Sequence, residues 1–217
     1  MARIRNLDFD EANSLEYEDY FGEMEIDDDG VEQRVLTAQI VDEHILEALS
    51  WYERRSPSVQ DGYSRIYDAY MEMLDDLDLA DDDYLAERAE SFAKQIEKTT
   101  REHSGEYWTS ADRASLIARV ESNIVNNYRD FAIASGLVGA GLAIARSQGR
   151  KKKHKTWVTM GDDRVRPSHV DMEDVTVPIN GFFYVGLSKS KMRFPMDTAF
   201  DPDPNEIINC RCTCYYS

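Results

Sequence analysis

The chain has 217 residues, 42% of them hydrophobic, and a net charge of −17. These values suit a soluble globular protein with one sizeable core or two modest domains. All three cysteines fall within the last eight residues at a spacing of two, so they can hardly bridge one another. We therefore expect a reducing compartment, which excludes a disulfide-stabilised secreted scaffold. We also expect no secretory signal, because no apolar run follows the arginines near the N-terminus.

The charge is distributed unevenly along the chain. Residues 1–100 contain 28 acidic and 9 basic side chains, whereas residues 101–217 contain 14 and 16. An acidic first half would be repelled by nucleic acid, so any contact with phosphate is expected from the second half. The most apolar stretch, Phe131–Ala145, has 15 residues, fewer than the roughly 20 that span a bilayer. We expect it to be a buried helix, with insertion into a membrane as the alternative.

The first two thirds of the chain are predicted to be helical. Residues 1–30 are too polar to bury themselves, and we expect an acidic arm that is either mobile or ordered by a partner. Residues 31–148 are predicted to form a helical domain, since apolar residues recur there at helical spacing. The first helix of this domain is expected over residues 31–51.

Three further helices are predicted by their start points and periodicity. One begins with Ser56 as N-cap and Pro57 at the first helical position. Another follows the acidic run at residues 81–83, where a helix N-terminus favours negative charge. The longest starts near Ser110 and continues through the apolar stretch to about Gln148.

Residues 149–217 are predicted to form a small β-rich unit, so the fold class is α+β. An alternating strand is expected at residues 156–160. Residues 175–179 and 182–185 flank Asn180-Gly181, a pattern typical of a β-hairpin in which Pro178 lies at an edge. A final strand would carry the cysteines. A unit of this size has only a small hydrophobic core, and a cross-link such as a bound metal ion would stabilise it.

His169, Cys210 and Cys212 are candidate metal ligands in this unit. Zinc takes thiolates and imidazoles in tetrahedral sets, and Asp163 or Cys214 could supply a fourth ligand. In an alternating strand, the three cysteines would share one face. The alternative is a hydrogen-bonded core histidine with thiols that act as small buried hydrophobes.

The loop after the first strand carries the charged residues Asp162, Asp163, Arg164 and Arg166. They could form a catalytic site with the His/Cys cluster, but an ion-pair network that fixes the loop is favoured in so small a unit. Ser168 and His169 are sequence neighbours rather than a nucleophile and its base. We therefore expect no catalytic residues; the competing class is a metal-dependent hydrolase or nuclease that uses Asp163, His169 and the cysteines.

A basic run precedes the first strand of the unit. It is either a solvated linker or a contact for the phosphates of double-stranded DNA. The candidate contact residues are Arg150, Lys151, Lys152, Lys153 and Lys155.

Several short motifs together resemble the phage Mu F-like head morphogenesis family, the minor head proteins of tailed viruses. The resemblance covers about residues 115–214, and its RVRPSH and NCRC blocks occur in the family's order. The chain departs from the family in lacking a glycine shortly after His169 and in having Cys214 as an extra thiol. The residues that carry the resemblance are Arg119, Glu121, Asn127, Lys155, Trp157, Asp163, Arg166, His169, Pro195, Asn209, Cys210, Arg211 and Cys212.

The resemblance implies a minor head protein that acts in head assembly or in the passage of DNA into and out of the capsid. Its expected partners are the portal protein and other capsid proteins, with packaged double-stranded DNA as a further candidate and no membrane. Its expected place is the virion, in the head interior or at the portal vertex, after assembly in the host cytoplasm. The family has no settled catalytic residues to transfer to this chain.

Overall fold

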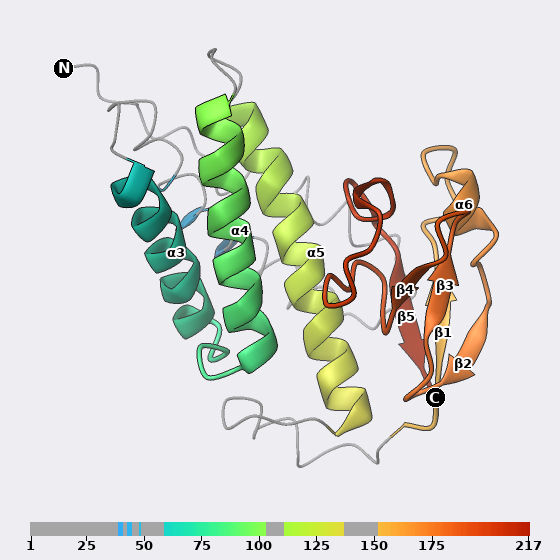
Figure 1. Ribbon diagram of the computed structural model, residues 1–217. Helices are drawn as coiled ribbons and strands as arrows, with labels where there is room; N and C mark the ends of the chain where they lie inside the picture. Colours follow the sequence, from blue (N-terminus) through green and yellow to red (C-terminus); the bar gives the residue numbers. More distant parts are fainter. Residues whose placement is uncertain (1–38, 41–42, 45–47, 49–58, 103–110, 137–151) are drawn as a thin grey trace.

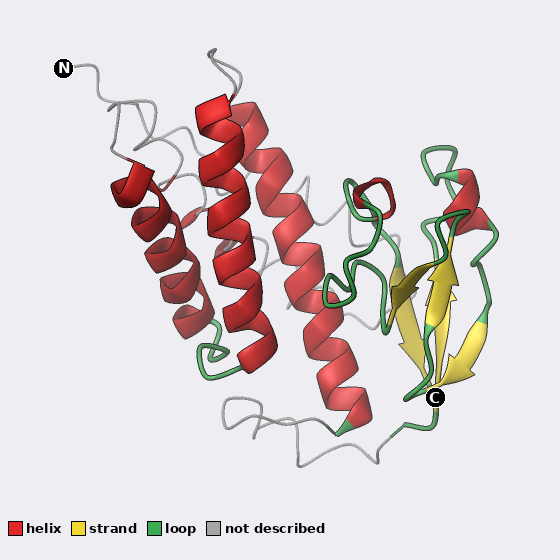
Figure 2. Cartoon of the chain, viewed as in Figure 1, coloured by secondary structure: helices red, strands yellow, loops and turns green. Residues whose placement is uncertain are grey.

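The computed structural model describes residues 39–40, 43–44, 48, 59–102, 111–136 and 152–217. The predicted α+β class is confirmed: long helices lie side by side, and the strands gather on one side of them (Figures 1 and 2). The expected arm at residues 1–30, the helix start at Ser56 and the basic residues Arg150 and Lys151 lie outside the described residues. The boundaries proposed for the domains stay predictions.

Two antiparallel helices form the outer part of the helical body. They are α3 (Val59–Asp76) and α4 (Asp83–Glu102), and their facing sides are apolar, with the rings of Tyr70 and Phe92 5.2 Å apart. Asp78, with a φ of 57°, turns the chain after α3. Asp82 then caps α4, because its carboxylate accepts the Leu85 N–H at 3.1 Å. The acidic run thus starts this helix, as predicted.

Helix α5 (Ala111–Ser135) lies between α4 and the strands (Figure 1). Its start near Ser110 agrees with the prediction, but its end does not. The helix stops before Gly136, which has a φ of +72°, a left-handed conformation that terminates helices and suits glycine. The prediction of one helix that continues to Gln148 is therefore wrong at Gly136, and residues 137–148 lie outside the described part of the chain.

The central part of α5 is buried despite its polar sequence. Glu121 is 2% exposed and accepts hydrogen bonds from Tyr70 Oη at 3.0 Å and from Arg88 Nε at 3.0 Å. A second Arg88 nitrogen bonds the other oxygen of the same carboxylate. This bidentate pair ties α5 to α3 and α4.

The C-terminal unit contains two small antiparallel sheets. The first has the strand order β2-β1-β5, with β1 at its centre, and the second pairs β3 with β4. The strands and short helices of the unit are β1 (His154–Val158), α6 (Pro167–Val170), β2 (Thr176–Pro178), β3 (Phe183–Val185), β4 (Ser190–Met192), the 3-10 helix η3 (Pro204–Glu206) and β5 (Thr213–Tyr216).

The hairpin predicted around Asn180-Gly181 is wrong. Gly181 N–H does close a turn onto Pro178 O at 2.7 Å, but β2 pairs with β1 and β3 pairs with β4. The buried ammonium of Lys155 explains the change, because it donates to Ile179 O and Gly181 O at 2.9 Å each and holds the turn against β1. Pro178 is on the edge strand of its sheet, as predicted.

The cysteines are not on one strand. Strand β5 begins at Thr213, so Cys210 and Cys212 belong to the loop before it and only Cys214 lies within it. Cys214 is opposite Trp157 in the register of β1 and β5. The expectation that all three thiols share a strand face is therefore wrong.

Aromatic side chains join the helices and the C-terminal unit in one core. The Phe194 ring lies 6.0 Å from Tyr84 and Tyr128 and 5.3 Å from Phe131. Beside these rings, the fully buried carboxylate of Asp197 accepts two hydrogen bonds from the Arg193 side chain, at 2.7 and 2.9 Å. The unit thus stabilises its small core by packing on α4 and α5.

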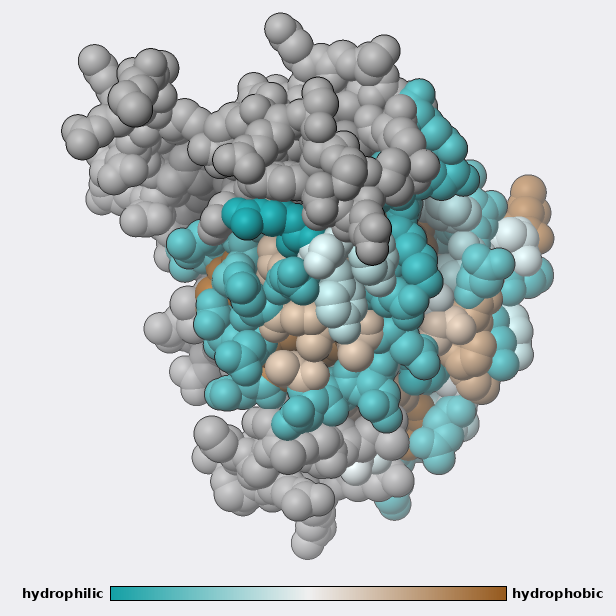
Figure 3. Space-filling model, turned by 60° about the vertical axis from the view of Figure 1, so that its left-hand side comes forward, coloured by the Kyte–Doolittle hydropathy of each residue, from teal (hydrophilic) through white to brown (hydrophobic). Residues whose placement is uncertain are grey.

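Seen from the helical side, the surface of the described residues is mostly hydrophilic around a small apolar area (Figure 3). In the described part of the chain, no helix has the length and apolar character needed to cross a membrane.

Candidate metal centre

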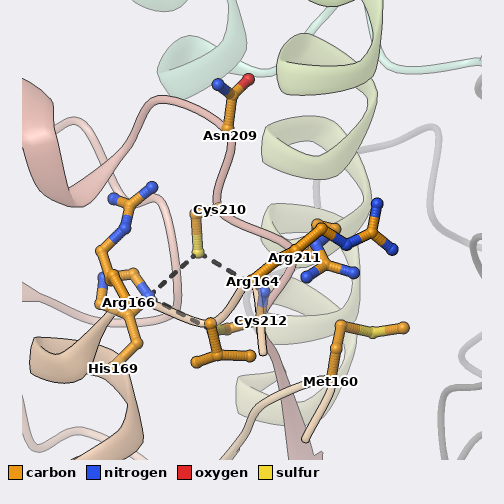
Figure 4. Close-up of a pocket in the computed structure, with 9 residues that line it drawn as sticks. Met160, Arg164, Arg166, His169, Asn209, Cys210, Arg211 and Cys212 are labelled. Atoms are coloured by element: carbon orange, nitrogen blue, oxygen red, sulfur yellow. Dashed lines mark hydrogen bonds between the residues drawn. The ribbon is translucent and has the colours of Figure 1, made fainter. Parts of the chain in front are cut away.

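Three of the predicted ligands come together in the C-terminal unit. His169 Nδ1 lies 3.3 Å from Cys212 Sγ and 3.5 Å from Cys210 Sγ. Their ligand atoms all lie within 4.8 Å of one another, and all three residues are buried. Figure 4 shows these three side chains close together among the residues that line a pocket.

The local sequence explains why these side chains meet. Pro167 starts the short helix α6, which places His169 in its last turn, facing the core. On the other side, Asn209 has a φ of 58°, a left-handed conformation that asparagine tolerates better than most residues. This turn directs the chain back so that Cys210 and Cys212 approach the histidine.

Helix α5 fixes the cysteine loop by its asparagines. Asn123 Nδ2 donates to Cys210 O at 3.2 Å, and Asn127 Nδ2 donates to Cys212 O at 3.0 Å and to Pro195 O at 3.1 Å. The two asparagines are four residues apart and therefore lie on one face of the helix. The family-like residue Asn127 thus positions the backbone of a candidate ligand.

The distances suit a tetrahedral zinc ion. With Zn–S and Zn–N bonds of about 2.3 and 2.0 Å, a tetrahedral site separates nitrogen from sulfur by about 3.5 Å. The observed separations are 3.3 and 3.5 Å. The pocket has a free volume of about 10 Å³, which is room for one water molecule or ion. It is lined by Met160, Arg164, Val165, Arg166, His169, Asn209, Cys210, Arg211 and Cys212.

The two thiols differ in acidity. Burial raises the pKa of Cys210, but hydrogen bonds with Cys212 and His169 outweigh it, so that the pKa lies below its usual value. The hydrogen bond to Cys210, together with burial, raises the pKa of Cys212 far above its usual range. Cys210 is therefore the thiol of the pair that loses its proton more readily, and an ion that binds both sulfurs would displace the protons they carry.

Trp157 closes the site from the side of the sheet. Its indole is fully buried, and its ring lies 5.4 Å from that of His169 in an edge-on arrangement. Phe183 packs on the tryptophan at 5.2 Å. The apolar wall keeps water from the ligands and restricts the orientation of the imidazole.

The charged loop forms an ion-pair network, as favoured from the sequence. Asp162, rather than Asp163, is the carboxylate at its centre. This carboxylate accepts hydrogen bonds from Arg211 Nη2 and from the backbone and side chain of Arg164. The bond from Arg211 lowers the pKa of Asp162 to about 2. Asp163, the residue predicted as a motif position and candidate ligand, is exposed and is not among the clustered ligands.

The remaining predicted residues have other positions. Cys214 is buried in β5 and does not belong to the cluster of ligand atoms. Lys152 and Lys153 are exposed, so they remain candidates for phosphate contact. Lys155 is fully buried, and burial lowers its pKa to about 8. Its ammonium binds carbonyls inside the protein, which removes it from the predicted DNA contacts.

One residue near the site was missed by sequence reasoning. It is Glu206, at the end of η3, whose Oε2 lies 3.0 Å from His169 Nε2. A carboxylate in a Pro-rich loop of an acidic protein gives no pattern that would single it out. Asp162 was expected in an ion-pair network, but its partner Arg211 was not predicted.

A family model covers the part of the chain that contains the candidate site. The family model described as "Phage Mu protein F like protein" matches residues 87–215, which is more than half of the chain. The chain belongs to the phage Mu F-like family. The match begins earlier than the resemblance in the sequence and includes both partners of the buried pair between Arg88 and Glu121. No curated protein and no solved structure gives a significant match.

Membership of the phage Mu F-like family indicates a role in phage head morphogenesis and a place in the virion. Within this unit, the family-like residues are structural: Arg166 binds two backbone carbonyls, Asn209 makes the turn, and Arg211 binds Asp162. These contacts all surround the His/Cys cluster.

Proposed function

We propose that this protein is a minor head protein of a tailed virus, present in few copies and associated with the portal. It would act in head assembly and in DNA packaging or ejection. The observation that carries the proposal is the family match over residues 87–215, which includes the three clustered residues His169, Cys210 and Cys212.

Particle composition tests this function. Quantitative mass spectrometry of purified virus particles and of empty proheads would count the copies of the chain in each. A few copies per particle, retained together with the portal protein, are expected. Absence from both kinds of particle would contradict the proposal.

The portal protein and other capsid proteins are the proposed partners, at the portal vertex or in the head interior. The excess of acidic side chains in residues 1–100 supports a protein partner rather than nucleic acid, because carboxylates would repel phosphates. Direct contact with the portal predicts that the two proteins copurify when they are expressed together.

Packaged DNA is a further proposed partner, through the basic run before β1. The exposed side chains of Lys152 and Lys153 support this contact. Changing Lys151, Lys152 and Lys153 to Glu should abolish DNA binding without loss of fold, as followed by a filter-binding assay and by circular dichroism. Equal binding by the triple variant would refute the contact.

We also propose that His169, Cys210 and Cys212 hold a zinc ion as a structural staple. The two observed nitrogen–sulfur distances fit tetrahedral zinc, and three buried ligands of this type suit zinc chemically. The staple would stabilise a small unit that has little core of its own.

A metal-dependent hydrolase or nuclease is the competing function, favoured only by the three-ligand geometry, which leaves one coordination position for water. Two observations weigh against it. The pocket of about 10 Å³ admits a single water but no substrate group. Asp163, the expected catalytic carboxylate, is exposed outside the cluster.

A further inference from the structure

A buried carboxylate lies on the side of His169 that faces away from the cysteines. Glu206 is 8% exposed, and its Oε2 atom is 3.0 Å from Nε2 of His169. The other ring nitrogen, Nδ1, faces Cys210 and Cys212. The histidine therefore lies between the two sulfurs and a carboxylate.

The protein builds a specific place for this carboxylate. Ser168 Oγ donates a hydrogen bond to Oε2 of Glu206 at 2.7 Å. Gly186, in the turn between β3 and β4, has a φ of +67°, and a Cβ atom at this position would overlap Oε1 of Glu206. A serine hydroxyl thus holds one oxygen, and a glycine leaves space for the other.

The backbone that carries Glu206 is also fixed. Arg166 donates to the carbonyls of Asn205 and Ile208, on either side of the glutamate. Arg166 directly precedes α6, which carries Ser168 and His169. One short segment therefore supplies the histidine, the hydroxyl that holds the carboxylate and the guanidinium that holds its loop.

The proton on the imidazole connects these contacts to metal binding. A histidine that binds an ion through Nδ1 carries its proton on Nε2, and in metal sites this N–H usually donates to a carboxylate or carbonyl. In the described part of the structure Nε2 makes no aligned hydrogen bond, although the carboxylate is 3.0 Å away. The distance is that of a hydrogen bond, so an N–H on Nε2 aligned with Oε2 would form one.

We propose that Glu206 is the positioning residue of the metal centre. It accepts the Nε2 proton of His169 and so fixes the tautomer and the ring orientation that present the Nδ1 lone pair to the ion. This inference rests on the proposed zinc site and adds a residue that does not itself bind the metal.

Zinc affinity of the full chain tests the role of Glu206. The zinc-loaded protein would be titrated with a chromophoric chelator, comparing wild type with Glu206→Gln, and with Glu173→Gln as a control. Glu173 is an exposed carboxylate of the same unit that accepts the Thr159 N–H. Glu206→Gln should weaken zinc binding by about 10- to 100-fold, the usual effect of losing such a partner, while Glu173→Gln binds as wild type.

A spectroscopic readout separates positioning from general stability. In 15N NMR spectra of the zinc-loaded wild type, His169 should show a metal-bound Nδ1 and a protonated Nε2 whose N–H signal has the downfield shift of a hydrogen bond to a carboxylate, and that shift should be smaller in Glu206→Gln. The urea midpoints of the metal-free proteins provide the reference for stability. If Glu206→Gln fails to fold, Ser168→Ala takes its place, because it releases Oε2 and keeps the charge; a measurable loss of zinc affinity is expected.

Two results would overturn the inference, and they differ in meaning. If Glu206→Gln, or Ser168→Ala in its place, binds zinc as tightly as wild type, the proposed role of Glu206 is wrong and the proposed metal site is unaffected. If the wild-type protein binds no zinc, both the metal site and the role of Glu206 are contradicted.

Discussion

Arg211 lies between the two clustered cysteines in sequence, yet its side chain binds a different loop. Its guanidinium donates to Asp162, and this hydrogen bond lowers the pKa of the carboxyl to about 2. Because the folded-state pKa lies below the unfolded value of about 3.9, the ionised form stabilises the fold. This contribution is present above pH 4 and disappears as the pH falls through about 2.

Replacing Asp162 by Asn should therefore lower the free energy of unfolding at pH 6 and should lose its effect as the pH approaches 2. The change is expected to be small, since the carboxylate is partly solvated. Urea unfolding between pH 6 and 2 measures it. Asp163→Asn is the matched control, because its carboxylate is exposed; an equal effect of the two variants would argue against the ion pair.

At the scale of the elements, α5 supports the cysteine loop through side-chain amides. Asn127 donates to Pro195 O and Cys212 O, and both bonds are buried. Removing the amide leaves two carbonyls without these donors inside the core. The cost of a buried group that loses its partner is about 1–3 kcal/mol.

Asn127→Ala should accordingly destabilise the protein by about 1–3 kcal/mol. Denaturant unfolding measures the loss, and Ile133→Ala, at an exposed position of the same helix, should change stability by less than about 0.5 kcal/mol. A loss for Asn127→Ala no greater than that of the control would show that α5 does not hold the loop by this contact.

The turn between β2 and β3 depends on a buried cation. Lys155 Nζ binds Ile179 O and Gly181 O and lies over the Phe131 ring at 4.8 Å. Lys155→Met keeps most of the side-chain volume but removes both donors, so a loss of about 1–3 kcal/mol is expected in thermal or urea unfolding. Lys153→Met, at an exposed position, is the control, and equal stability of both variants would be inconsistent with this account.

Much of this arrangement could be predicted from the sequence, for reasons that differ between elements. Helix α3 follows from apolar periodicity. The meeting of His169 with Cys210 and Cys212 follows from ligand chemistry, although the shared strand face that was expected to bring the cysteines together is absent. The pairing of β2 with β1 could not be predicted, because a local turn pattern does not show that a distant lysine binds its carbonyls. Glu206 and Asp162 depend on contacts across 37 and 49 residues, which the spacing of residue types cannot show.

At the scale of the whole molecule, the small C-terminal unit has two supports. One is its packing on the helices, through Phe194 and the pair between Arg193 and Asp197. The other is the His/Cys cluster, which joins α6 to the loop before β5. If the second support is a zinc ion, the family-like residues around it share one purpose, which is to hold the ligands in place.

The number of zinc ions bound to the intact chain tests this central claim most directly. Native mass spectrometry of the full-length protein should find one zinc per chain in wild type and in Cys214→Ser, and none in Cys210→Ser or Cys212→Ser. A chelator should also lower the melting temperature of the wild type markedly. A wild-type chain that holds no zinc, and melts at the same temperature with and without chelator, would show that hydrogen bonds alone hold the cluster together.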